Sequence, residues 1–375
     1  MARAGLGNGW DCAFANDFDP AKAATYKANW GDDHLLVADV NSVTGADLPG
    51  QADLVWASFP CQDLSLAGNA RGLGTEQAQT RSGAFWAFWR VMIDLKRRSQ
   101  APSLIVLENV YGVLTANGGR DFATIARALA IEGYRFGAVV IDAVHFVPQS
   151  RPRVFIVAVR GDLSVPVGLT TPHAVKAWHP PAMAAAIARL AEVDQECWVW
   201  LAPPKPTARP VDLASLIDEV PDGVSWHTPE ETARLIGMMG TASLAKLAAL
   251  KAAKTVAVGT IYKRTRPDAS GKRVQRAELR SDQIAGCLRT PGGGSSRQIV
   301  VLVKGDAVRT RLLSAREAAR LMGLPDSYKL PTRYNDAYHV AGDGLVVPVV
   351  RYLAETIIEP ILDANEQDIF SVAAE

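Results

Sequence analysis

The stretch ADLVWASFPCQ, residues 52–62, is the part of the chain that best indicates its fold. Its first eight residues are mostly apolar, which is typical of a strand that is buried on both faces of a parallel sheet. A proline ends this predicted strand, and the single cysteine Cys61 follows at its carboxyl end. A lone cysteine is most often a small buried hydrophobic residue, whereas a thiol at the end of a strand can also be a reactive group.

Further apolar runs of similar length predict additional strands. These runs cover residues 12–18, 34–40, 103–110 and 153–159. Amphipathic patterns that predict helices cover residues 19–30, 82–98 and 121–133. Apolar strands that alternate with helices indicate an α/β fold with a doubly wound, mostly parallel sheet of the Rossmann-like kind.

The composition of the sequence becomes richer in proline beyond the last of these strands, and this change predicts three segments. Residues 1–162 form the α/β domain, residues 163–335 form a smaller domain rich in proline and loops, and residues 336–375 contain an apolar helix that returns to the first domain. Within the second segment, an alanine-rich helix is expected over 241–254 and a capped helix over 314–323.

Composition excludes several classes of protein. The 375 residues are 48% hydrophobic and 21% charged, with no apolar run that could span a bilayer and no signal-peptide pattern, so we expect a cytoplasmic protein without a membrane partner. The four cysteines form no CxxC pair, which argues against a zinc site and against a disulfide framework. The net charge is only +1, so any surface that binds nucleic acid must be local.

Reactive and charged residues follow several of the predicted strands. Asp17 and Phe18 close the first strand, Asp39 follows the second, Cys61 the third, and Glu108 the fourth. Because ligands bind beyond the carboxyl ends of the strands in an open parallel sheet, these groups should share one edge. Each has a simpler explanation, such as helix capping by the aspartates, a loop start at the glutamate or a buried thiol, but these explanations would have to hold independently at every strand end. A thiolate beside a carboxylic acid can attack an electron-poor ring whose nitrogen the acid protonates.

Five blocks of the sequence, in this order, resemble the DNA cytosine-5 methyltransferases. They are FPCQ (59–62), LENV (107–110), PQSRPRVFIVAV (148–159), RTRLLSAREAARLMGLPDSYKL (309–330) and GDGLVVPVVRYLAETI (342–357). The resemblance covers nearly the whole chain outside a variable region at about 161–285. It implies that residues 163–335 form a target-recognition domain and that the cofactor is S-adenosylmethionine.

The resemblance also implies roles for individual residues. Cys61 matches the nucleophile that adds to carbon 6 of cytosine, Glu108 matches the acid that contacts the ring nitrogen, and Arg153 matches the arginine at the base carbonyl, with Arg151 beside it. The positions implied for the nucleophile loop and the base are Pro60, Gln62, Asn109, Val110 and Gln149.

The cofactor site implied by the resemblance lies at the first two strand ends and in the last block. Asp17 matches the acid that binds the ribose, Phe18 the aromatic residue that stacks on adenine, and Asp39 the acid that reads the adenine amino group. The remaining positions are Val40, Phe59, Gly344 and Leu345.

A basic segment over 262–280 is the candidate surface for the DNA backbone. Cytosine is inaccessible in a duplex, so the enzyme must flip the base out and hold the opened DNA. The predicted phosphate contacts are Lys263, Arg264, Arg266, Lys272, Arg273 and Arg276. A charge run of this kind taken alone is more often a solvated surface loop. The expected partner is double-stranded DNA, bound by a monomer in a bacterial or phage setting at the nucleoid, with a cognate restriction endonuclease acting separately.

Two departures from the family pattern stand out. The family has a first strand and a Phe-x-Gly-x-Gly-Gly loop for the methionine end of the cofactor, and counting back from Asp17 places Met1 just after that loop. We therefore expect weak cofactor binding or inactivity of the chain as written. Asp343 stands where the family commonly has asparagine. The alternatives are a tRNA cytosine-5 methyltransferase of the same architecture and an inactive DNA-binding remnant.

Overall fold

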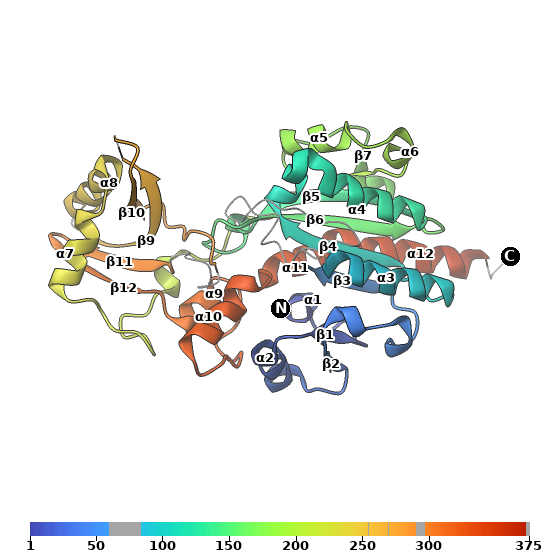
Figure 1. The fold of residues 1–375 in the computed structure, drawn as a ribbon, viewed down its shortest axis with the longest axis horizontal. Coiled ribbons are helices and arrows are strands. Elements are labelled where there is room, and N and C mark those ends of the chain that lie inside the picture. The colour runs from blue at the N-terminus through green and yellow to red at the C-terminus, as the bar shows by residue number, and fades with distance from the viewer. Residues whose placement is uncertain (60–83, 254, 269, 290–296, 373–375) are drawn as a thin grey trace.

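The computed structural model describes residues 1–59, 84–253, 255–268, 270–289 and 297–372. The chain forms a large α/β domain and a smaller domain built around an antiparallel sheet, with helices α9 (Ala315–Arg320) and α10 (Tyr334–Asp343) between them (Figure 1). None of the helices in these ranges is both long and apolar enough to cross a membrane.

The main sheet of the large domain has the strand order β3-β4-β6-β5. Its members are β3 (Leu54–Ser58), β4 (Leu104–Val110), β6 (Pro152–Arg160) and β5 (Tyr134–Asp142). Strands β3 and β4 are parallel, and their register places Ser58 opposite Glu108. Both strands therefore end at the same edge, as the sequence predicted for the segments that lead to Cys61 and Glu108.

Strand β6 runs antiparallel to both of its neighbours. The sequence did not predict β5, which begins directly after the glycine that ends the preceding helix. Only residues 143–151 connect β5 to β6, and a connection this short cannot hold the crossover helix that a parallel pair requires. The α/β fold class is confirmed, with a sheet that is mixed.

A second, two-stranded parallel sheet contains β1 (Ala15–Asp17) and β2 (Leu35–Val37). Within the described residues no ladder joins it to β3. Helix α2 (Pro20–Trp30) connects the two strands and begins at Asp19, whose carboxylate accepts hydrogen bonds from two backbone amides of the first turn. The predicted cap is therefore present, and Asp17 ends its strand two residues earlier.

Helices cover both faces of the main sheet, which explains why its central strands are apolar throughout. On one face lie α3 (Ala84–Arg97) and α4 (Arg120–Ile131), with Phe85, Phe122 and other buried side chains against the sheet. On the other lies α11 (Val347–Leu353), which continues through a π-helical turn into α12 (Glu359–Val372) (Figure 1). The short helix α1 (Ala2–Leu6) packs on α11, where Gly5 leaves no room for a side chain against Val350.

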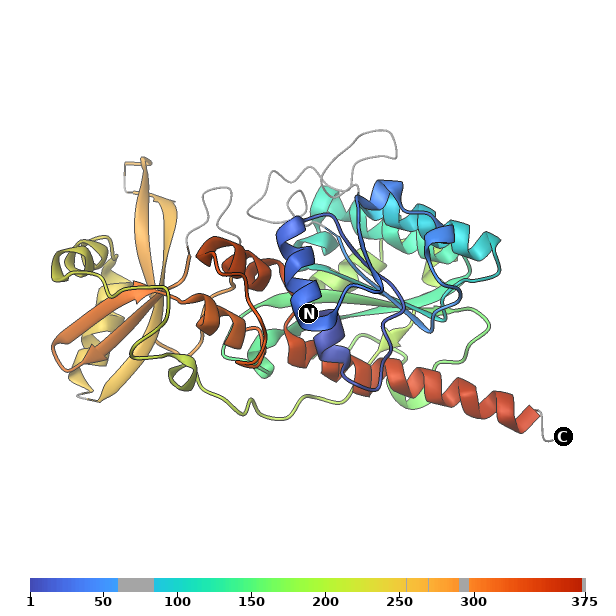
Figure 2. The same ribbon diagram turned by 90° about the horizontal axis from the view of Figure 1, so that it is seen from below.

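The smaller domain is an antiparallel sheet with the strand order β10-β9-β11-β12. The strands are β9 (Val256–Pro267), β10 (Arg273–Arg280), β11 (Ile299–Lys304) and β12 (Ala307–Leu312). Helices α7 (Pro229–Gly237) and α8 (Thr241–Ala252) contribute to its core. Figure 2 shows the β9–β10 hairpin projecting from this domain as a two-stranded arm.

Part of the segment that we assigned to the second domain packs on the first. Helix α5 (Pro181–Ile187) belongs to the core formed by α3 and α4. The short strands β7 (Thr170–Thr171) and β8 (Trp200–Leu201) pair with each other, and β8 contacts β5. Helix α6 (Glu192–Gln195) contacts α4. The separate core of the smaller domain contains residues between 235 and 303. The boundaries at 162/163 and 335/336 stay predictions.

A buried ion pair lies where the smaller domain meets α9. Arg311 Nη2 is 2.6 Å from Glu317 Oε1, and both side chains are 0% exposed. Glu317 also accepts a hydrogen bond from the backbone amide of Ser314, which caps α9 as the sequence predicted.

We expect Glu317→Gln to destabilise the protein by about 3 kcal/mol, because it leaves the buried guanidinium without a countercharge. The midpoint of urea unfolding measures this loss. The matched control is Glu355→Gln, which removes an exposed partner of Arg351 and should cost no more than about 1 kcal/mol. Equal losses in the two variants would contradict the prediction.

Candidate active site

Parallel pairing of β3 and β4 builds the centre of the candidate site. Glu108 lies near the end of β4, directly opposite Ser58, the last residue of β3. The chain therefore leaves β3 beside Glu108. The predicted nucleophile Cys61, together with Pro60 and Gln62, lies outside the described residues.

The last described residue of this segment is fixed from two sides. Phe59 is 8% exposed, and its ring packs against Phe85 of α3 with a centroid distance of 5.4 Å. The amide nitrogen of Asn109 donates to the backbone oxygen of Phe59 over 3.4 Å, while its amide oxygen accepts from the backbone amide of Val110. Asn109 therefore contacts the last described residue before the predicted nucleophile loop, and its assignment to that loop stays a prediction.

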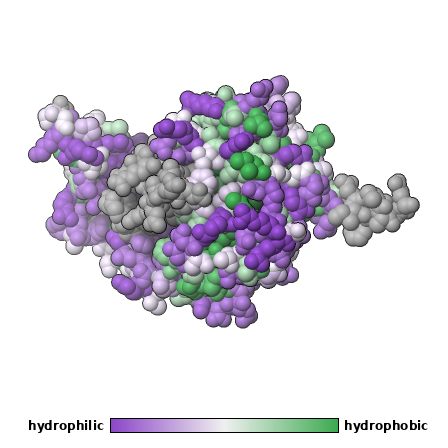
Figure 3. All heavy atoms as spheres, turned by 45° about the vertical axis from the view of Figure 1, so that its right-hand side comes forward, coloured by the Kyte–Doolittle hydropathy of each residue, from purple (hydrophilic) through white to green (hydrophobic). Residues whose placement is uncertain are grey.

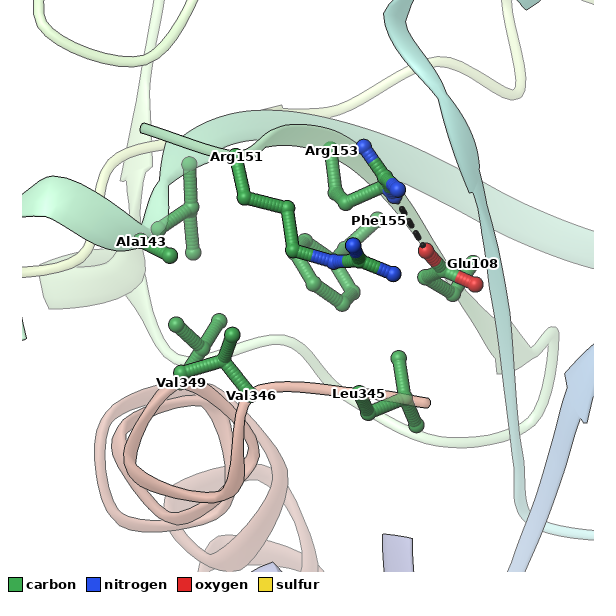
Figure 4. A pocket seen from close by; sticks show the side chains of 9 residues that line it. Glu108, Ala143, Arg151, Arg153, Phe155, Leu345, Val346 and Val349 are labelled. Carbon is green, nitrogen blue, oxygen red and sulfur yellow. Dashed lines mark ion pairs between the residues drawn. The ribbon is translucent and has the colours of Figure 1, made fainter. Parts of the chain in front are cut away.

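Glu108 and Arg153 form an ion pair at this edge. Arg153 Nε is 3.1 Å from Glu108 Oε1, and the two side chains are 15% and 12% exposed. Because the residues sit on the adjacent strands β6 and β4, the sheet itself sets their distance. Figure 4 shows both groups on a cavity of about 10 Å³, whose apolar walls include Phe155 and Leu345. A carboxyl group and a guanidinium thus share a space that is shielded from most of the solvent.

Arg151 is a buried anchor. Its side-chain nitrogens donate to the backbone oxygens of Leu288, Gly342 and Gly344 over 2.9, 2.8 and 2.9 Å. Burial, helped by the charge of Arg153, lowers the pKa of this guanidinium from its ordinary value. The contacts tie the turn before α11, which carries the predicted cofactor residue Gly344, to the start of β6, the strand that carries Arg153.

Gln149 joins the two domains. Its side chain is 0% exposed; the amide nitrogen donates to Leu321 O over 2.8 Å, and the amide oxygen accepts from Leu288 N over 3.1 Å. Both the amide nitrogen and the amide oxygen of Gln149 are therefore hydrogen-bonded to the backbone of the protein. Gln149 therefore supports the backbone at Leu288 and Leu321, and its predicted place at the nucleophile loop and the base stays a prediction.

The predicted cofactor residues lie at the ends of β1 and β2. Asp17 accepts a hydrogen bond from Asp19 N, Asp39 accepts one from Asn41 N at the turn that starts with Val40, and the side chain of Phe18 is 71% exposed. An exposed aromatic ring offers a face on which a purine can stack. An acid at a strand end suits ribose hydroxyls. These residues fit the nucleoside part of S-adenosylmethionine.

Asp343 pairs with Lys22. The Nζ and Oδ2 atoms are 2.8 Å apart, and the two side chains are 33% and 40% exposed. Burial would lower the pKa of Lys22, but the charge of Asp343 and its hydrogen bond, together with the charges of Asp17 and Asp19, outweigh burial and raise this pKa above its ordinary value. The carboxylate that departs from the family pattern therefore connects the end of α10 to helix α2, which follows the predicted cofactor residues Asp17 and Phe18 in the sequence.

The β9–β10 hairpin divides its cations between two faces. Side chains alternate along a strand, so register places Arg264 and Arg266 on one face with Arg276, opposite the face of Lys263. Glu278 lies 2.9 Å from Arg266 and 3.8 Å from Arg264, while Arg264 also stacks on Tyr262. Lys272 and Arg273 lie at the tip. In Figure 3 the smaller domain is mainly hydrophilic on the face shown, whereas hydrophobic patches gather over the large domain.

Sequence reasoning missed two residues near the site. Lys22 belongs to a helix whose polar residues gave no functional signal. Cys287 was noted only as one of four cysteines, yet its sulfur is 3.4 Å from Arg151 Nη1. Neither partnership has a local pattern, because each links segments more than 130 residues apart.

Acids at the ends of the strands of the small parallel sheet and a Glu-Arg pair at the edge of the main sheet lie in an α/β fold, which is the Rossmann-like fold of the solved methyltransferases. The profile of the family described as C-5 cytosine-specific DNA methylase matches residues 2–359, and the chain belongs to this family. It is a cytosine-5 methyltransferase that uses S-adenosylmethionine.

Individual relatives are distant in sequence but similar over almost their full length. The chain is 25% identical over 353 residues to the type II methyltransferase M.HhaI of Haemophilus parahaemolyticus, covering 93% of this chain and 88% of that protein. It is 26% identical over 371 residues to M.HpaII of Haemophilus parainfluenzae, covering 94% and 84%. The solved structure of Spodoptera frugiperda DNMT2 shares the fold with a TM-score of 0.55 at 17% identity, and the match covers 93% of this chain and 93% of that one. The structure of Entamoeba histolytica EhMeth shares it with a TM-score of 0.56 at 13% identity, and the match covers 91% of this chain and 88% of that one.

Proposed function

We propose that the protein methylates carbon 5 of a flipped-out cytosine in duplex DNA through a covalent bond to Cys61. The observation that carries the proposal is the register of β3 and β4, which sets Ser58, three residues before Cys61 in the sequence, opposite Glu108, the ion-pair partner of Arg153. The curated relatives M.HhaI and M.HpaII are named type II methyltransferases, which supports a modification enzyme.

The residues of the chain divide the reaction between them. The Cys61 thiolate forms a bond to carbon 6, and Glu108 donates a proton to the ring nitrogen as electron density moves toward carbon 5. Arg153 orients Glu108 and contacts the base carbonyl. Once carbon 5 carries the methyl group, a water molecule accepts the carbon 5 proton. The electron pair of that bond forms the double bond between carbons 5 and 6 as the sulfur–carbon bond breaks, which restores the ring and the thiolate, and the ring proton returns to Glu108.

S-adenosylmethionine supplies an electrophilic methyl group when bound. We assign its ribose to Asp17 and its adenine to Phe18 and Asp39, with Val40 and Phe59 nearby and Gly344 and Leu345 on the side of α11. The ion pair of Lys22 and Asp343 links the segments that carry these two groups of residues. Arg151 supports the turn before α11 by donating hydrogen bonds to the backbone oxygens of Gly342 and Gly344.

The DNA backbone is assigned to the arm formed by β9 and β10. Phosphates neutralised by clustered arginines supply much of the affinity of such proteins, and they must offset the few kcal/mol that base flipping costs. The face that carries Arg264, Arg266 and Arg276 is the stronger candidate, with Lys272 and Arg273 at the tip and Lys263 on the other face. We propose that the protein acts on DNA as a monomer and that a cognate endonuclease works separately.

Transfer of a labelled methyl group distinguishes the proposal from its alternatives. The full chain, at saturating S-adenosylmethionine, should methylate mixed-sequence duplex DNA and leave tRNA unlabelled. Labelling of tRNA alone would establish an RNA enzyme. Duplex binding without labelling of either nucleic acid would establish a DNA-binding remnant.

Glu278 should weaken DNA binding, because it competes with phosphate for two arginines. Burial would raise the pKa of this carboxyl group, but hydrogen bonds from Arg266 and Tyr262 and the charge of Arg264 hold the pKa below its ordinary value, so the group is ionised at neutral pH. We expect Glu278→Gln to tighten binding of a fluorescent duplex about threefold at low salt, with a smaller gain at high salt.

Fluorescence anisotropy titrations at two salt concentrations measure this effect. The matched control is Asp306→Asn, which removes the same charge at the exposed β11–β12 turn of the same sheet and should leave affinity unchanged. An unchanged or weaker affinity of the Glu278 variant would place the DNA elsewhere.

A further inference from the structure

The segment 281–289 carries the chain from the β9–β10 arm into the candidate active site. Ala285 forms a parallel bridge with Gln149; its backbone amide donates to Pro148 O over 2.8 Å, and its oxygen accepts from Ser150 N over 3.0 Å. These hydrogen bonds fix the backbone two residues before Cys287. The sulfur of Cys287 therefore lies next to Arg151, in the turn before β6, and next to Arg153, on β6.

Cys287 contacts both arginines that the site uses. Its sulfur lies 3.4 Å from Arg151 Nη1 and 4.0 Å from Arg153 Nη2, and Arg153 in turn meets Glu108. The sulfur of Cys287 therefore contacts both the buried Arg151 and Arg153, the ion-pair partner of Glu108.

The sulfur is also a candidate countercharge for the buried guanidinium of Arg151. This guanidinium is 3% exposed, and among the described residues its hydrogen-bond partners other than the thiol are backbone oxygens, with no carboxylate in an ion pair with it. A buried cation without a countercharge is costly. A thiolate at position 287 would supply the missing negative charge.

The surroundings of the thiol favour that ionised form. Burial would raise the pKa of Cys287, but the positive charges of Arg151, Arg153 and Arg289 outweigh it and hold the pKa below its ordinary value. Among the described residues, two further titratable groups act on this cluster: Glu108 on β4, which pairs with Arg153, and Tyr338 on α10, whose pKa is raised by burial, so that its phenol stays neutral.

We propose that Cys287 is a positioning residue of the methyl-transfer reaction, whose sulfur holds Arg151 and Arg153 in the arrangement that presents Glu108 to the base. This inference rests on the proposed function. The thiolate is present above the lowered pKa of Cys287 and is lost as the pH falls through it, so its contribution to the rate is lost in the same direction. Because the sulfur belongs to the connection from the arm, docking of this connection and alignment of the arginines depend on each other.

Steady-state kinetics on the full chain test the proposal. Cys287→Ala should lower kcat about tenfold while the KM for duplex DNA stays within about twofold, because misalignment acts on the chemical step. Cys287→Ser keeps a hydrogen-bond acceptor without the charge, so its kcat should lie between those of wild type and Cys287→Ala. The ratio of wild-type kcat to that of Cys287→Ser should fall toward one as the pH is lowered. Cys197→Ala, a free cysteine outside the site, is the control and should match wild type.

A second measurement does not depend on catalysis. The pH midpoint for alkylation of Cys287 by iodoacetamide, read by peptide mass spectrometry, should lie below that of Cys197, whose pKa is raised by burial and by Asp194 and Glu196. Arg153→Gln should move the midpoint of Cys287 upward.

The proposal is overturned if Cys287→Ala keeps the wild-type kcat, if Cys287→Ser and Cys287→Ala lose activity equally at every pH, or if Cys287 alkylates no more readily than Cys197. A wild-type protein that methylates no DNA would instead refute the proposed function, and the alkylation midpoints would still decide whether the sulfur is the countercharge of the arginines.

Discussion

Cys61→Ser is expected to abolish methyl transfer, with a fall of about a thousandfold or more, while duplex binding stays within about twofold of wild type. A serine hydroxyl has nearly the size of the thiol but is far less ionised at neutral pH and attacks carbon 6 poorly. The phosphate contacts assigned to the β9–β10 arm are untouched by the substitution. Incorporation of labelled methyl groups into DNA and anisotropy of a fluorescent duplex measure the two quantities on the same preparation.

The matched control is Cys197→Ser, which makes the same chemical change at a cysteine between α6 and β8. This variant should transfer methyl groups at the wild-type rate. A Cys61→Ser enzyme that retained more than a tenth of the activity would show that the sulfur is not the nucleophile.

Glu108→Gln should lower kcat about a thousandfold, which corresponds to about 4 kcal/mol at the transition state. Glutamine fits the same space and still forms hydrogen bonds, but it cannot deliver a proton to the ring nitrogen, and it removes the charge that pairs with Arg153. Single-turnover kinetics with prebound duplex isolate this step from product release.

Glu132→Gln provides the control, because it also replaces a carboxylate that pairs with a cation, Lys96, outside the site. Its rate should not change. If Glu108→Gln reacted within tenfold of wild type, protonation of the ring would have to come from another group, and the role of the Glu108–Arg153 pair would be structural.

The sequence located the reactive edge of the sheet because the information there is local. Apolar runs such as 104–107 end abruptly at a charged residue, and parallel strands end at a common edge. Glu108 and the chain leading to Cys61 could therefore be predicted to lie together from the sequence alone. The same reasoning found Asp17, Phe18 and Asp39 at the ends of the two strands of the small parallel sheet.

Other features depended on contacts that no local pattern records. The direction of β6 follows from the missed strand β5, since a short connection forces antiparallel pairing. The partners Lys22 and Asp343 are 321 positions apart, and Cys287 meets Arg151 across 136 positions. The faces of the β9–β10 arm depend on register, which the composition of residues 262–280 does not specify.

The structure also gives Asp343 a role that the sequence left open. Its carboxylate holds Lys22, and an asparagine in the same place could accept a hydrogen bond but would not neutralise the lysine. The pair is partly exposed, so its contribution to stability is small. Its significance lies in position, because it connects the two groups of cofactor residues.

The most direct measurement of the central claim is covalent trapping. The full chain, incubated with S-adenosylmethionine and a duplex that contains 5-fluorocytosine at its target, should form a denaturation-resistant complex, because fluorine replaces the carbon 5 proton whose loss releases the enzyme. Peptide mass spectrometry should place the modified pyrimidine on Cys61. Methylation of ordinary DNA without any trapped complex, or a pyrimidine attached to a cysteine other than Cys61, would contradict the account.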